Sequence, residues 1–470
     1  MRLTLAAVAE ATGGRVVGGP PETAVDGASM DSRTLDPGSL FVAVRADRDG
    51  HDFVGDAFER GAAAALVARD VEAAGPLVVV DDTERALTAL GSAARERLGG
   101  IPVVGITGSA GKTSTKDLCR GALAASRPVH ASPASFNNEI GVPLTLLATP
   151  PDAAAVVVEM GARGVGHIAA LAGVVRPTVG VVTTVGAAHI ELFGSVDEVA
   201  KAKGELLEAL PDDGVGVVGD GHPWVDALVA RSRADVFVVG SHPGADVVVD
   251  NLRVDSELRA RFDLRSPWGS AEIALAVRGA HQAANAAMAA TVALALGDPL
   301  DAVVAGLAQA EGSPWRMELE RTRSGVIVVN DAYNANPMST AAALEALAAL
   351  DVAGRRWAVL GEMAELGDDA AAEHERVGQR AADLGVDVVV TVGAAAAPAA
   401  EAAAAAGVET QQVSGPDGAL TLLAAAIEPG DAVLLKGSRV AGLERVAEAL
   451  LAHPHVDLPR VTDTDAVDAP

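Results

Sequence analysis

The stretch that decides the fold is IPVVGITGSAGKTS, which runs from Ile101 to Ser114. An apolar run over 101–107 is followed by a glycine turn, and a helical pattern then begins at Lys112 and continues to about Ala125. A buried strand, a glycine loop and a helix in this order predict a phosphate-binding loop. Glycines let backbone N–H groups turn toward a phosphate, and the helix N-terminus adds the positive end of its dipole.

Two side chains add chemistry to this loop. Lys112 can reach the β- and γ-phosphates of a nucleotide, and the hydroxyl of Thr113 is suited to Mg²⁺. The common pattern has a glycine five residues before Gly111, where this chain has Ile106, so the spacing is a variant. A glycine turn that merely contains Lys-Thr is the alternative, and the strand–loop–helix context favours the phosphate loop. We therefore expect nucleotide contacts from Gly108, Ser109, Ala110, Gly111, Lys112, Thr113 and Ser114.

The pattern on both sides of the loop predicts an α/β fold. Further apolar runs over 153–160, 178–185, 215–218 and 236–239 alternate with helical patterns. Short buried strands with helices between them are typical of a doubly wound, mostly parallel sheet. Residues 246–278 differ, because three runs separated by turn residues predict an antiparallel meander.

The length predicts about three domains, since 470 residues are available at roughly 150 per domain. We expect a small α/β domain over 1–99 and the central phosphate-loop domain over 100–312. The strand and helix pattern then restarts, which predicts a Rossmann-like α/β domain over 313–455. Residues 456–470 are acidic and without periodicity, and we expect a loose tail there.

Charge and cysteine content exclude several classes of protein. With 36 Lys+Arg against 63 Asp+Glu, the net charge is −27. Such a chain does not suit nucleic acid, which needs a basic surface, but a locally positive pocket can still bind small anions. Cys119 is the single cysteine, so a disulfide framework is excluded and we expect a reducing compartment, the cytoplasm.

One segment reaches the length of a membrane span. Residues 279–297 carry no formal charge. The segment is mostly alanine, however, and it contains His281, Gln282 and Asn285. We therefore interpret it as a buried or half-buried helix of a soluble domain, and we expect no insertion into a membrane.

Several polar residues follow predicted strands, where the ligands of parallel sheets gather. Glu159 ends one strand and is placed either to hold a metal near the nucleotide or to cap a helix. His189 and Glu191 follow the next strand, and a metal or phosphate role for His189 is favoured over a structural one. Lys201 and Lys203 come next. Either they form a solvated face, or one of them points back to the metal cluster.

Three short polar segments stand out in this apolar chain: SFNNE over 135–139, DAYNANP over 331–337 and KGSR over 436–439. Each has the composition of an ordinary turn. Their shared position around strand ends favours a cleft lined by ligand-binding side chains instead.

Taken together, these residues resemble the Mur ligases, the ATP-dependent amide-forming enzymes of peptidoglycan synthesis. The resemblance covers about 1–452. The phosphate loop of this family has the short form Thr-Gly-x-x-Gly-Lys-Thr, which explains the variant spacing over 107–113. Ala110 stands where family members more often carry Asn or Ser, and a contact made by the backbone should survive that change.

Within the family, the motifs point to the branch that adds D-alanyl-D-alanine to UDP-N-acetylmuramoyl-tripeptide. The Asp-Asn-Pro-Arg motif of the branch that adds diaminopimelate or lysine is absent. The motifs are Asn137-Asn138-x-x-Gly141-x-Pro143, Glu159-Met160-Gly161, Gly186-x-Ala188-His189-x-Glu191, Tyr333-Asn334-Ala335-Asn336-Pro337, Gly361-Glu362-Met363-x-Glu365-Leu366-Gly367 and Lys436-Gly437-Ser438-Arg439.

The resemblance implies roles for individual residues. Thr113 and Glu159 would hold a Mg²⁺ that bridges the β- and γ-phosphates, and His189 would serve a second Mg²⁺. Lys203 lies at the position of a carbamylated lysine, whose carboxylate-like anion suits two neighbouring cations. The expected catalytic groups are Lys112, His189 and Lys203, and the expected metal ligands are Thr113, Glu159, His189 and carbamylated Lys203.

Ligand contacts are implied in all three domains. His281, Asn285, Arg316 and Asp331 would contact ATP, with Asn285 at the adenine. Asp31-Ser32-Arg33 resembles the motif that recognises the UDP group. Substrate contacts are expected from Ser32, Arg33, Asn137, Asn138, Asn334, Asn336, Lys436 and Arg439.

The implied reaction joins two substrates at the expense of ATP. The tripeptide carboxylate attacks the γ-phosphorus to give an acyl phosphate and ADP, and the amine of D-alanyl-D-alanine then displaces phosphate. Mg²⁺ is the implied cofactor, and we expect a monomer whose third domain closes on the nucleotide. The alternatives are a UDP-muramoyl-tripeptide synthetase, a folylpolyglutamate synthase-like ligase, or a non-catalytic nucleotide-binding protein on the same scaffold.

Overall fold

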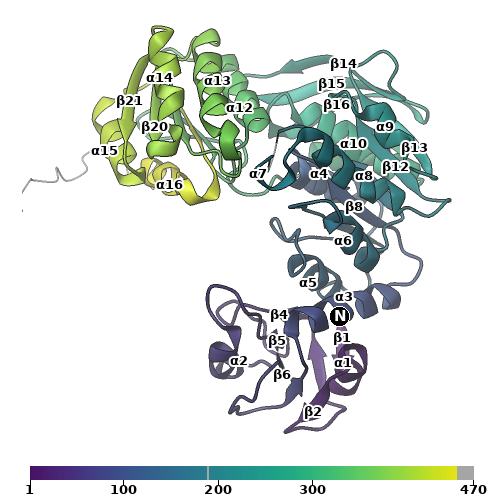
Figure 1. Cartoon of the computed structure of the whole chain (residues 1–470). Helices are drawn as coiled ribbons and strands as arrows, with labels where there is room; N and C mark the ends of the chain where they lie inside the picture. The colour runs from purple at the N-terminus through teal and green to yellow at the C-terminus, as the bar shows by residue number, and fades with distance from the viewer. Residues whose placement is uncertain (188–189, 453–470) are drawn as a thin grey trace, which may run out of the picture.

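The computed structural model describes residues 1–187 and 190–452. Along this part of the chain, three main sheets follow one another, and each is packed with helices (Figure 1). Most of the strand pairs are parallel, so the predicted α/β fold class is confirmed.

The first sheet has the strand order β2-β7-β6-β5-β4, with only β2 antiparallel to its neighbour in this described sheet. A separate antiparallel pair, β1 and β3, lies beside it. The strands are β1 (Arg2–Thr4), β2 (Arg15–Val17), β3 (Ala24–Asp26), β4 (Ala28–Ser29), β5 (Leu40–Val42), β6 (Ala64–Val67) and β7 (Leu77–Val79). The helices are α1 (Leu5–Thr12), α2 (Val54–Glu59) and α3 (Thr83–Arg97).

The central sheet has the order β16-β15-β14-β13-β12-β11-β8-β10-β9 and is parallel from β9 to β14. Its strands are β8 (Val103–Thr107), β9 (Val129–Ala131), β10 (Ala155–Glu159), β11 (Val179–Val182), β12 (Val215–Gly219), β13 (Asp235–Gly240), β14 (Val247–Val254), β15 (Arg259–Ser266) and β16 (Gly269–Arg278). Its helices are α4 (Lys112–Ala124), α5 (Gly141–Leu147), α6 (His167–Val175), α7 (Ile190–Phe193), α8 (Val196–Glu208), α9 (Val225–Val229), α10 (Gln282–Ala295) and α11 (Leu300–Ala308). The predicted meander is present as β14–β16, and it extends this sheet rather than forming one of its own.

Burial on both faces explains why β8 lies inside the sheet. Every residue of β8 is buried. Val104 and Ile106 belong to the core on one face, together with Leu118 of α4, whereas Val103 belongs to the core on the other face. A strand that is apolar on both sides gains most from an interior position in a parallel sheet, where helices cover both faces.

The uncharged segment 279–297 contains α10, which packs against α4 and the central sheet. Its buried alanines, among them Ala286, Ala287 and Ala290, let the backbones approach closely. The helix is 14 residues long. In the part of the chain that the structure describes, no helix combines the length and apolar character needed to cross a membrane.

The third sheet has the order β17-β18-β22-β19-β20-β21, and only its first described pair is antiparallel. The strands are β17 (Glu318–Arg321), β18 (Ile327–Asp331), β19 (Arg356–Gly361), β20 (Val388–Val392), β21 (Glu409–Val413) and β22 (Ala432–Lys436). The helices are α12 (Pro337–Ala349), α13 (Ala370–Asp383), α14 (Ala397–Ala405), α15 (Pro416–Ala426) and α16 (Glu444–Ala452). The expected tail over 456–470 lies outside the described residues.

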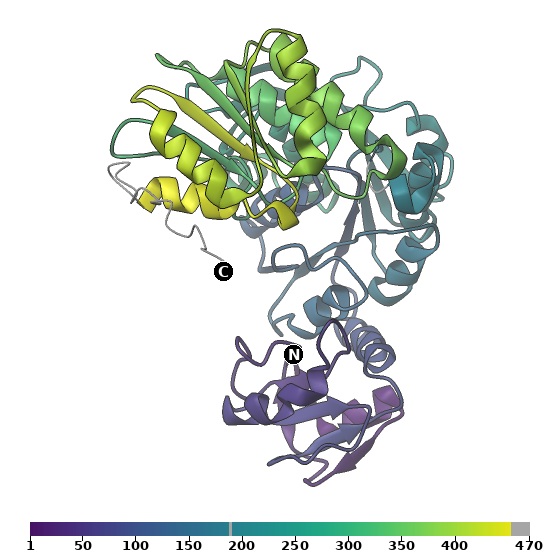
Figure 2. The same cartoon turned by 60° about the vertical axis from the view of Figure 1, so that its left-hand side comes forward.

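The first and third sheets both adjoin the central sheet. The third lies beside it, whereas the first lies below it in these views, with α3 and α5 between them (Figures 1 and 2). One apolar core cluster runs from Leu87 of α3 through Val142 of α5 to Val158 of β10. The predicted boundary at residue 99 is therefore crossed by packed side chains, and the domain boundaries themselves stay a prediction.

Arg95 fastens α3 to the central sheet. It is buried and donates to the carbonyl oxygens of Val175 at 2.8 Å, Gly99 at 3.0 Å and Arg176 at 3.1 Å. The Val175 carbonyl belongs to the last residue of α6, and those of Gly99 and Arg176 lie just beyond the ends of α3 and α6, where a helix leaves its last carbonyls without partners. One guanidinium thus satisfies acceptors of both segments.

We expect Arg95→Met to lower the free energy of unfolding by about 2–3 kcal/mol, because three carbonyl oxygens, that of Val175 buried, would lose a charged donor. Chemical denaturation followed by circular dichroism measures this. The control is Arg97→Met in the last turn of the same helix, where the side chain is exposed and a change within about 0.5 kcal/mol is expected. Equal effects of the two substitutions would contradict the fastening role of Arg95.

Candidate active site

The phosphate loop, residues 108–111, joins the end of β8 to the start of α4. Gly111 has a φ of 81°, a left-handed conformation that favours glycine, and a Cβ there would lie 2.7 Å from Asn285 Oδ1. A Cβ on Gly108 would lie 1.8 Å from Thr183 Oγ1. Both glycines are therefore required by the close approach of neighbouring elements, and the first amides of α4 remain available to an anion.

The strand β11 and the residues after it hold the loop in place. The Ser109 amide donates to Thr184 O at 2.9 Å, and the Ala110 amide donates to Thr184 Oγ1 at 3.1 Å. Ser109 Oγ also donates to Gly186 O at 3.0 Å. The sequence analysis did not single out Thr183 and Thr184, which both contact Ala110. A pair of polar residues at the end of an apolar run was the signal that could have identified them.

Thr113 and Glu159 meet beside the loop. Thr113 Oγ1 donates to Glu159 Oε2 at 2.8 Å, and Asn137 Nδ2 donates to Glu159 Oε1 at 2.8 Å. Glu159 is 1% exposed, so its carboxylate is held in a fixed position by these two donors. The sequence predicted all three residues as ligand contacts but did not predict that the amide orients the carboxylate.

Two lysine side chains line the cavity at the phosphate loop. Lys112 Nζ donates to Gly108 O at 2.7 Å, and desolvation lowers its pKa, an effect that the Glu159 carboxylate opposes. Lys203 of α8 is buried, and desolvation lowers its pKa well below the ordinary value, with a further contribution from Lys112. Lys201 is exposed and pairs with Glu198 at 3.6 Å. Of the two lysines that the sequence left open, Lys203 is the one that turns inward.

Polar residues of α10 border the phosphate loop. Asn285 Nδ2 donates to Gln282 Oε1 at 3.0 Å, and Gln282 Nε2 lies 3.4 Å from Ser114 Oγ. His281 immediately precedes the helix and lines the cavity next to these amides. The predicted nucleotide contacts His281 and Asn285 therefore lie beside the loop, and Gln282 joins them.

Segments that flank β17 and β18 of the third sheet also reach the loop. Arg316 donates to Thr113 Oγ1 at 2.9 Å and lies over the Tyr333 ring, 4.3 Å from its centroid. Asn336 Nδ2 donates to Ser109 O at 3.3 Å, and the Tyr333 hydroxyl contacts Ser135 Oγ. Residues far apart in sequence thus meet at one phosphate loop.

A buried ion pair joins the ends of two strands of the third sheet near Arg316. Lys436 Nζ, at the end of β22, lies 2.9 Å from Asp331 Oδ2 at the end of β18. Desolvation lowers the pKa of Lys436, and Asp331 opposes that shift. The pair places one cation and one anion at the edge of the cleft, and Asp331 Oδ1 also accepts from the Met317 amide at 3.2 Å.

The cleft between the central and third sheets has a volume of about 520 Å³. Four of the predicted residues that the structure describes do not line this cleft: Gly108, Ser32 and Arg33, which lie between β4 and β5, and Arg439. Ala188 and His189 lie outside the described residues. The predicted residues that line the cleft are Ser109, Ala110, Gly111, Lys112, Thr113, Ser114, Asn137, Asn138, Glu159, Lys203, His281, Asn285, Arg316, Asp331, Asn334, Asn336 and Lys436.

The predicted residues that do not line the cleft contact other parts of the protein. Arg33 is exposed and forms a bidentate pair with Asp31, at 2.9 and 2.8 Å, which lowers the pKa of Asp31 to about 2. Ser32, between them, is buried. Arg439 lies over the Trp315 ring, 4.2 Å from its centroid.

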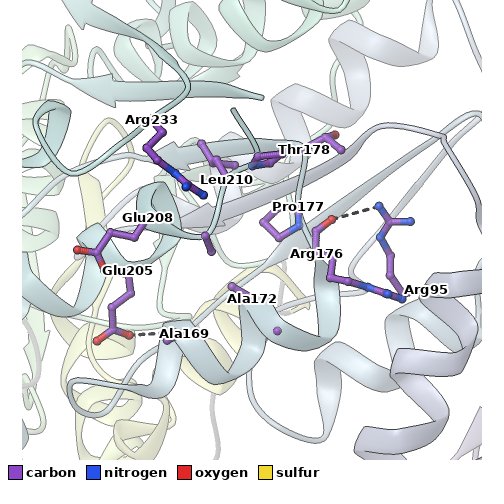
Figure 3. Close-up of a pocket in the computed structure, with 13 residues that line it drawn as sticks. Arg95, Ala169, Ala172, Arg176, Pro177, Thr178, Glu205, Glu208, Leu210 and Arg233 are labelled. Carbon is purple, nitrogen blue, oxygen red and sulfur yellow. Dashed lines mark hydrogen bonds between the residues drawn. The ribbon is translucent and has the colours of Figure 1, made fainter. Parts of the chain in front are cut away.

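A second hollow of about 640 Å³ lies at the opposite edge of the central sheet, before β11 and β12 (Figure 3). It is lined by both signs of charge, with Glu205 and Glu208 on one side and Arg95 on the other (Figure 3). Glu205 accepts from the Ala169 amide at 2.9 Å, and the donors of Arg95 already bind carbonyls. These groups are engaged in holding helices, so the cleft at the phosphate loop is the better candidate for chemistry.

Two family models match the chain, "Mur ligase middle domain" over residues 106–293 and "Mur ligase, glutamate ligase domain" over 315–439. The chain is 41% identical to the UDP-N-acetylmuramoyl-tripeptide–D-alanyl-D-alanine ligase of Mycobacterium tuberculosis, over 96% of this chain and 98% of that protein. The structure is similar to that of MurF from Acinetobacter baumannii, with a TM-score of 0.86, 30% identity and coverage of 96% and 99%. It is also similar to MurF ligase from Thermotoga maritima in complex with ADP, with a TM-score of 0.77, 29% identity and coverage of 91% and 97%.

We expect Gly111→Ala to weaken the binding of ADP about tenfold or more. The substitution strains a left-handed residue by about 1–2 kcal/mol and directs a methyl group at Asn285. Isothermal titration measures the dissociation constant. The control is Gly173→Ala, in α6, where a Cβ would meet no atom within 4 Å and where alanine should stabilise by about 0.5–1 kcal/mol without changing affinity. Unchanged ADP affinity in the Gly111 variant would contradict the assignment of the loop.

Proposed function

The chain belongs to the Mur ligase family, and on that basis we propose how its cleft performs the reaction of its relatives. The protein is an ATP-dependent ligase that joins D-alanyl-D-alanine to UDP-N-acetylmuramoyl-tripeptide in peptidoglycan synthesis. The observation that supports this use of the cleft is the hydrogen bond from Arg316 to Thr113, because it brings the third sheet onto the phosphate loop. We further propose a monomer that works in the cytoplasm.

Charge neutralisation is the main task of the site. The first step brings a carboxylate of the tripeptide to the γ-phosphate of ATP, and like charges repel. Lys112, Arg316 and Lys436 border the cleft as cations. Fixed cations in a partly desolvated cleft stabilise the charge of the transferring phosphoryl group without reorganising during the reaction.

The residues beside the loop fit a Mg²⁺ ion. Thr113 and Glu159 supply a hydroxyl and a carboxylate, both buried and 2.8 Å apart, and Mg²⁺ prefers such oxygen ligands. When bound, the ion would neutralise charge on the β- and γ-phosphates. Asn137 would keep the Glu159 carboxylate turned toward it. His189 stays the proposed ligand of a second Mg²⁺.

We propose that the Lys203 amine is carbamylated, for a physical reason. Its amine is buried with a strongly lowered pKa, and among the described residues no carboxylate pairs with it. A neutral amine attacks CO₂, so that an N–C bond forms, the nitrogen loses a proton, and a carbamate anion remains. The anion replaces a buried neutral amine next to Lys112, and it would supply oxygen ligands for a metal.

Once the acyl phosphate has formed, the amine of D-alanyl-D-alanine attacks the acyl carbon and phosphate leaves. No bond to the protein is required. Asn137, Asn138, Asn334 and Asn336 offer amide groups along the cleft for the two peptides. The UDP group of the acceptor would bind at Ser32 and Arg33 of the first sheet, and Arg439 would contact substrate at the edge of the third.

We expect phosphate release only when ATP, UDP-N-acetylmuramoyl-tripeptide and D-alanyl-D-alanine are all present. In Lys112→Ala, kcat should fall about a thousandfold while circular dichroism stays unchanged, because one charged contact to the transferring phosphate is lost. A coupled phosphate assay measures both. Assays that pair diaminopimelate or glutamate with the acceptor each requires test the other ligases of the family. Turnover with either of these amines alone, or an active Lys112 variant, would contradict the proposal.

We expect Lys203→Ala to lose about a hundredfold or more in kcat and to regain part of it with formate or acetate, which supply the missing carboxylate. The matched control is Lys201→Ala on the same helix, whose side chain is exposed and which should keep full activity. Carbon-13 NMR after exchange with labelled bicarbonate should show a carbamate in the parent and the Lys201 variant but not in the Lys203 variant. A parent without that signal would contradict carbamylation.

A further inference from the structure

A buried ion pair lies on α4, one turn after the phosphate loop. Lys116 and Asp117 are 2% and 5% exposed, and Lys116 Nζ lies 3.0 Å from Asp117 Oδ1. Burying two charges costs several kcal/mol, and apolar side chains of similar size would often serve stability as well or better. The contacts that the two groups make on either side indicate a different purpose.

The ammonium of Lys116 holds the loop that precedes α5. It donates to Ser132 O and to Ala134 O, each at 2.9 Å, which with Asp117 uses all three of its N–H groups. Ala134 has a φ of 46°, so the chain turns there in a left-handed conformation that alanine disfavours. The ammonium thus fixes a strained turn.

This turn leads directly to the groups that orient the proposed metal ligand. The Glu159 amide donates to Ser132 Oγ at 3.1 Å, and Asn137, a few residues on, donates to the Glu159 carboxylate. Ser135 contacts Tyr333 of the third sheet. Displacing the turn would therefore move the Glu159 carboxylate and a contact between the sheets together.

The carboxylate of Asp117 holds the chain that enters the third sheet. Asp117 Oδ2 accepts from the Ser313 amide at 2.9 Å and from Ser313 Oγ at 2.6 Å. Three residues later, Arg316 donates to Thr113 at 2.9 Å. Asp117 and Thr113 lie on the same helix, so the segment 313–316 is attached to α4 at two points.

We propose that Lys116 and Asp117 are positioning residues that join α4, the 132–137 loop and the 313–316 segment into one unit. The pair sets where Glu159 and Arg316 stand relative to the phosphate loop. The inference rests on the proposed function, because positioning is measured through turnover. The phosphate loop itself is held by Thr183 and Thr184, so loss of the pair should affect the chemical step more than nucleotide binding.

The experiment compares two buried carboxylates, Asp117 within α4 and Asp298, which pairs with a residue just after α4. Asp117→Asn should lower kcat about ten- to a hundredfold, because small displacements of catalytic groups have effects of that size. The dissociation constant for ADP should change less than about threefold. The control is Asp298→Asn, since Asp298 is buried and pairs with Arg127, just after α4, away from the cleft. It should cost thermal stability while leaving kcat near that of the parent.

A double variant separates positioning from stability. Lys116→Met with Asp117→Val replaces the pair by apolar groups, which should return the thermal midpoint close to that of the parent. Activity should stay at least tenfold low, because Ser132, Ala134 and Ser313 would still lack their partners. If kcat recovers together with the thermal midpoint, or if Asp117→Asn resembles Asp298→Asn, the positioning role is wrong. A parent protein without ligase activity would instead contradict the proposed function.

Discussion

The phosphate loop imposes the constraint on which the rest of the structure depends. To receive a phosphate, the first amides of α4 must stay unpaired, so the loop before them has to be held by other contacts. Thr184 binds the Ser109 and Ala110 amides, and Asn285 closes against Gly111. The strand β11, which pairs with β8, and the alanine-rich helix α10, which packs on α4, support this turn.

A second consequence is the placement of charge. The chain carries a net charge of −27, yet four lysines, at positions 112, 116, 203 and 436, converge on the phosphate loop or on the segments that bear on it. Their partners separate Lys203 from the rest. Lys116 and Lys436 each bind one carboxylate and two carbonyl oxygens, and Lys112 binds the Gly108 carbonyl oxygen. Lys203 has no carboxylate partner among the described residues. Our assignment of Lys203 to carbamylation follows from this difference.

The fold was largely predictable because its signals are local. Apolar runs predicted β8, β10, β11, β12 and β13, and the turns over 246–278 predicted the antiparallel meander. The short edge strands β9, β17 and β21 were not predicted, because an edge strand exposes one side and shows no continuous apolar run. The support of the loop by Thr183 and Thr184 and the bonds of Lys116 to Ser132 and Ala134 depend on chain segments that meet only after folding.

The sequence by itself determined the strand, glycine turn and helix that form the phosphate loop, and the family, because these depend on residue types at fixed short spacings. It also predicted that Glu159 and the phosphate loop with Thr113 share one edge of a sheet. Only the tertiary structure decided that Lys203 rather than Lys201 turns inward, and that Arg316 binds Thr113. Both outcomes depend on how a helix and a distant sheet pack against the loop, and packing over such sequence distances leaves no periodic signal in the chain.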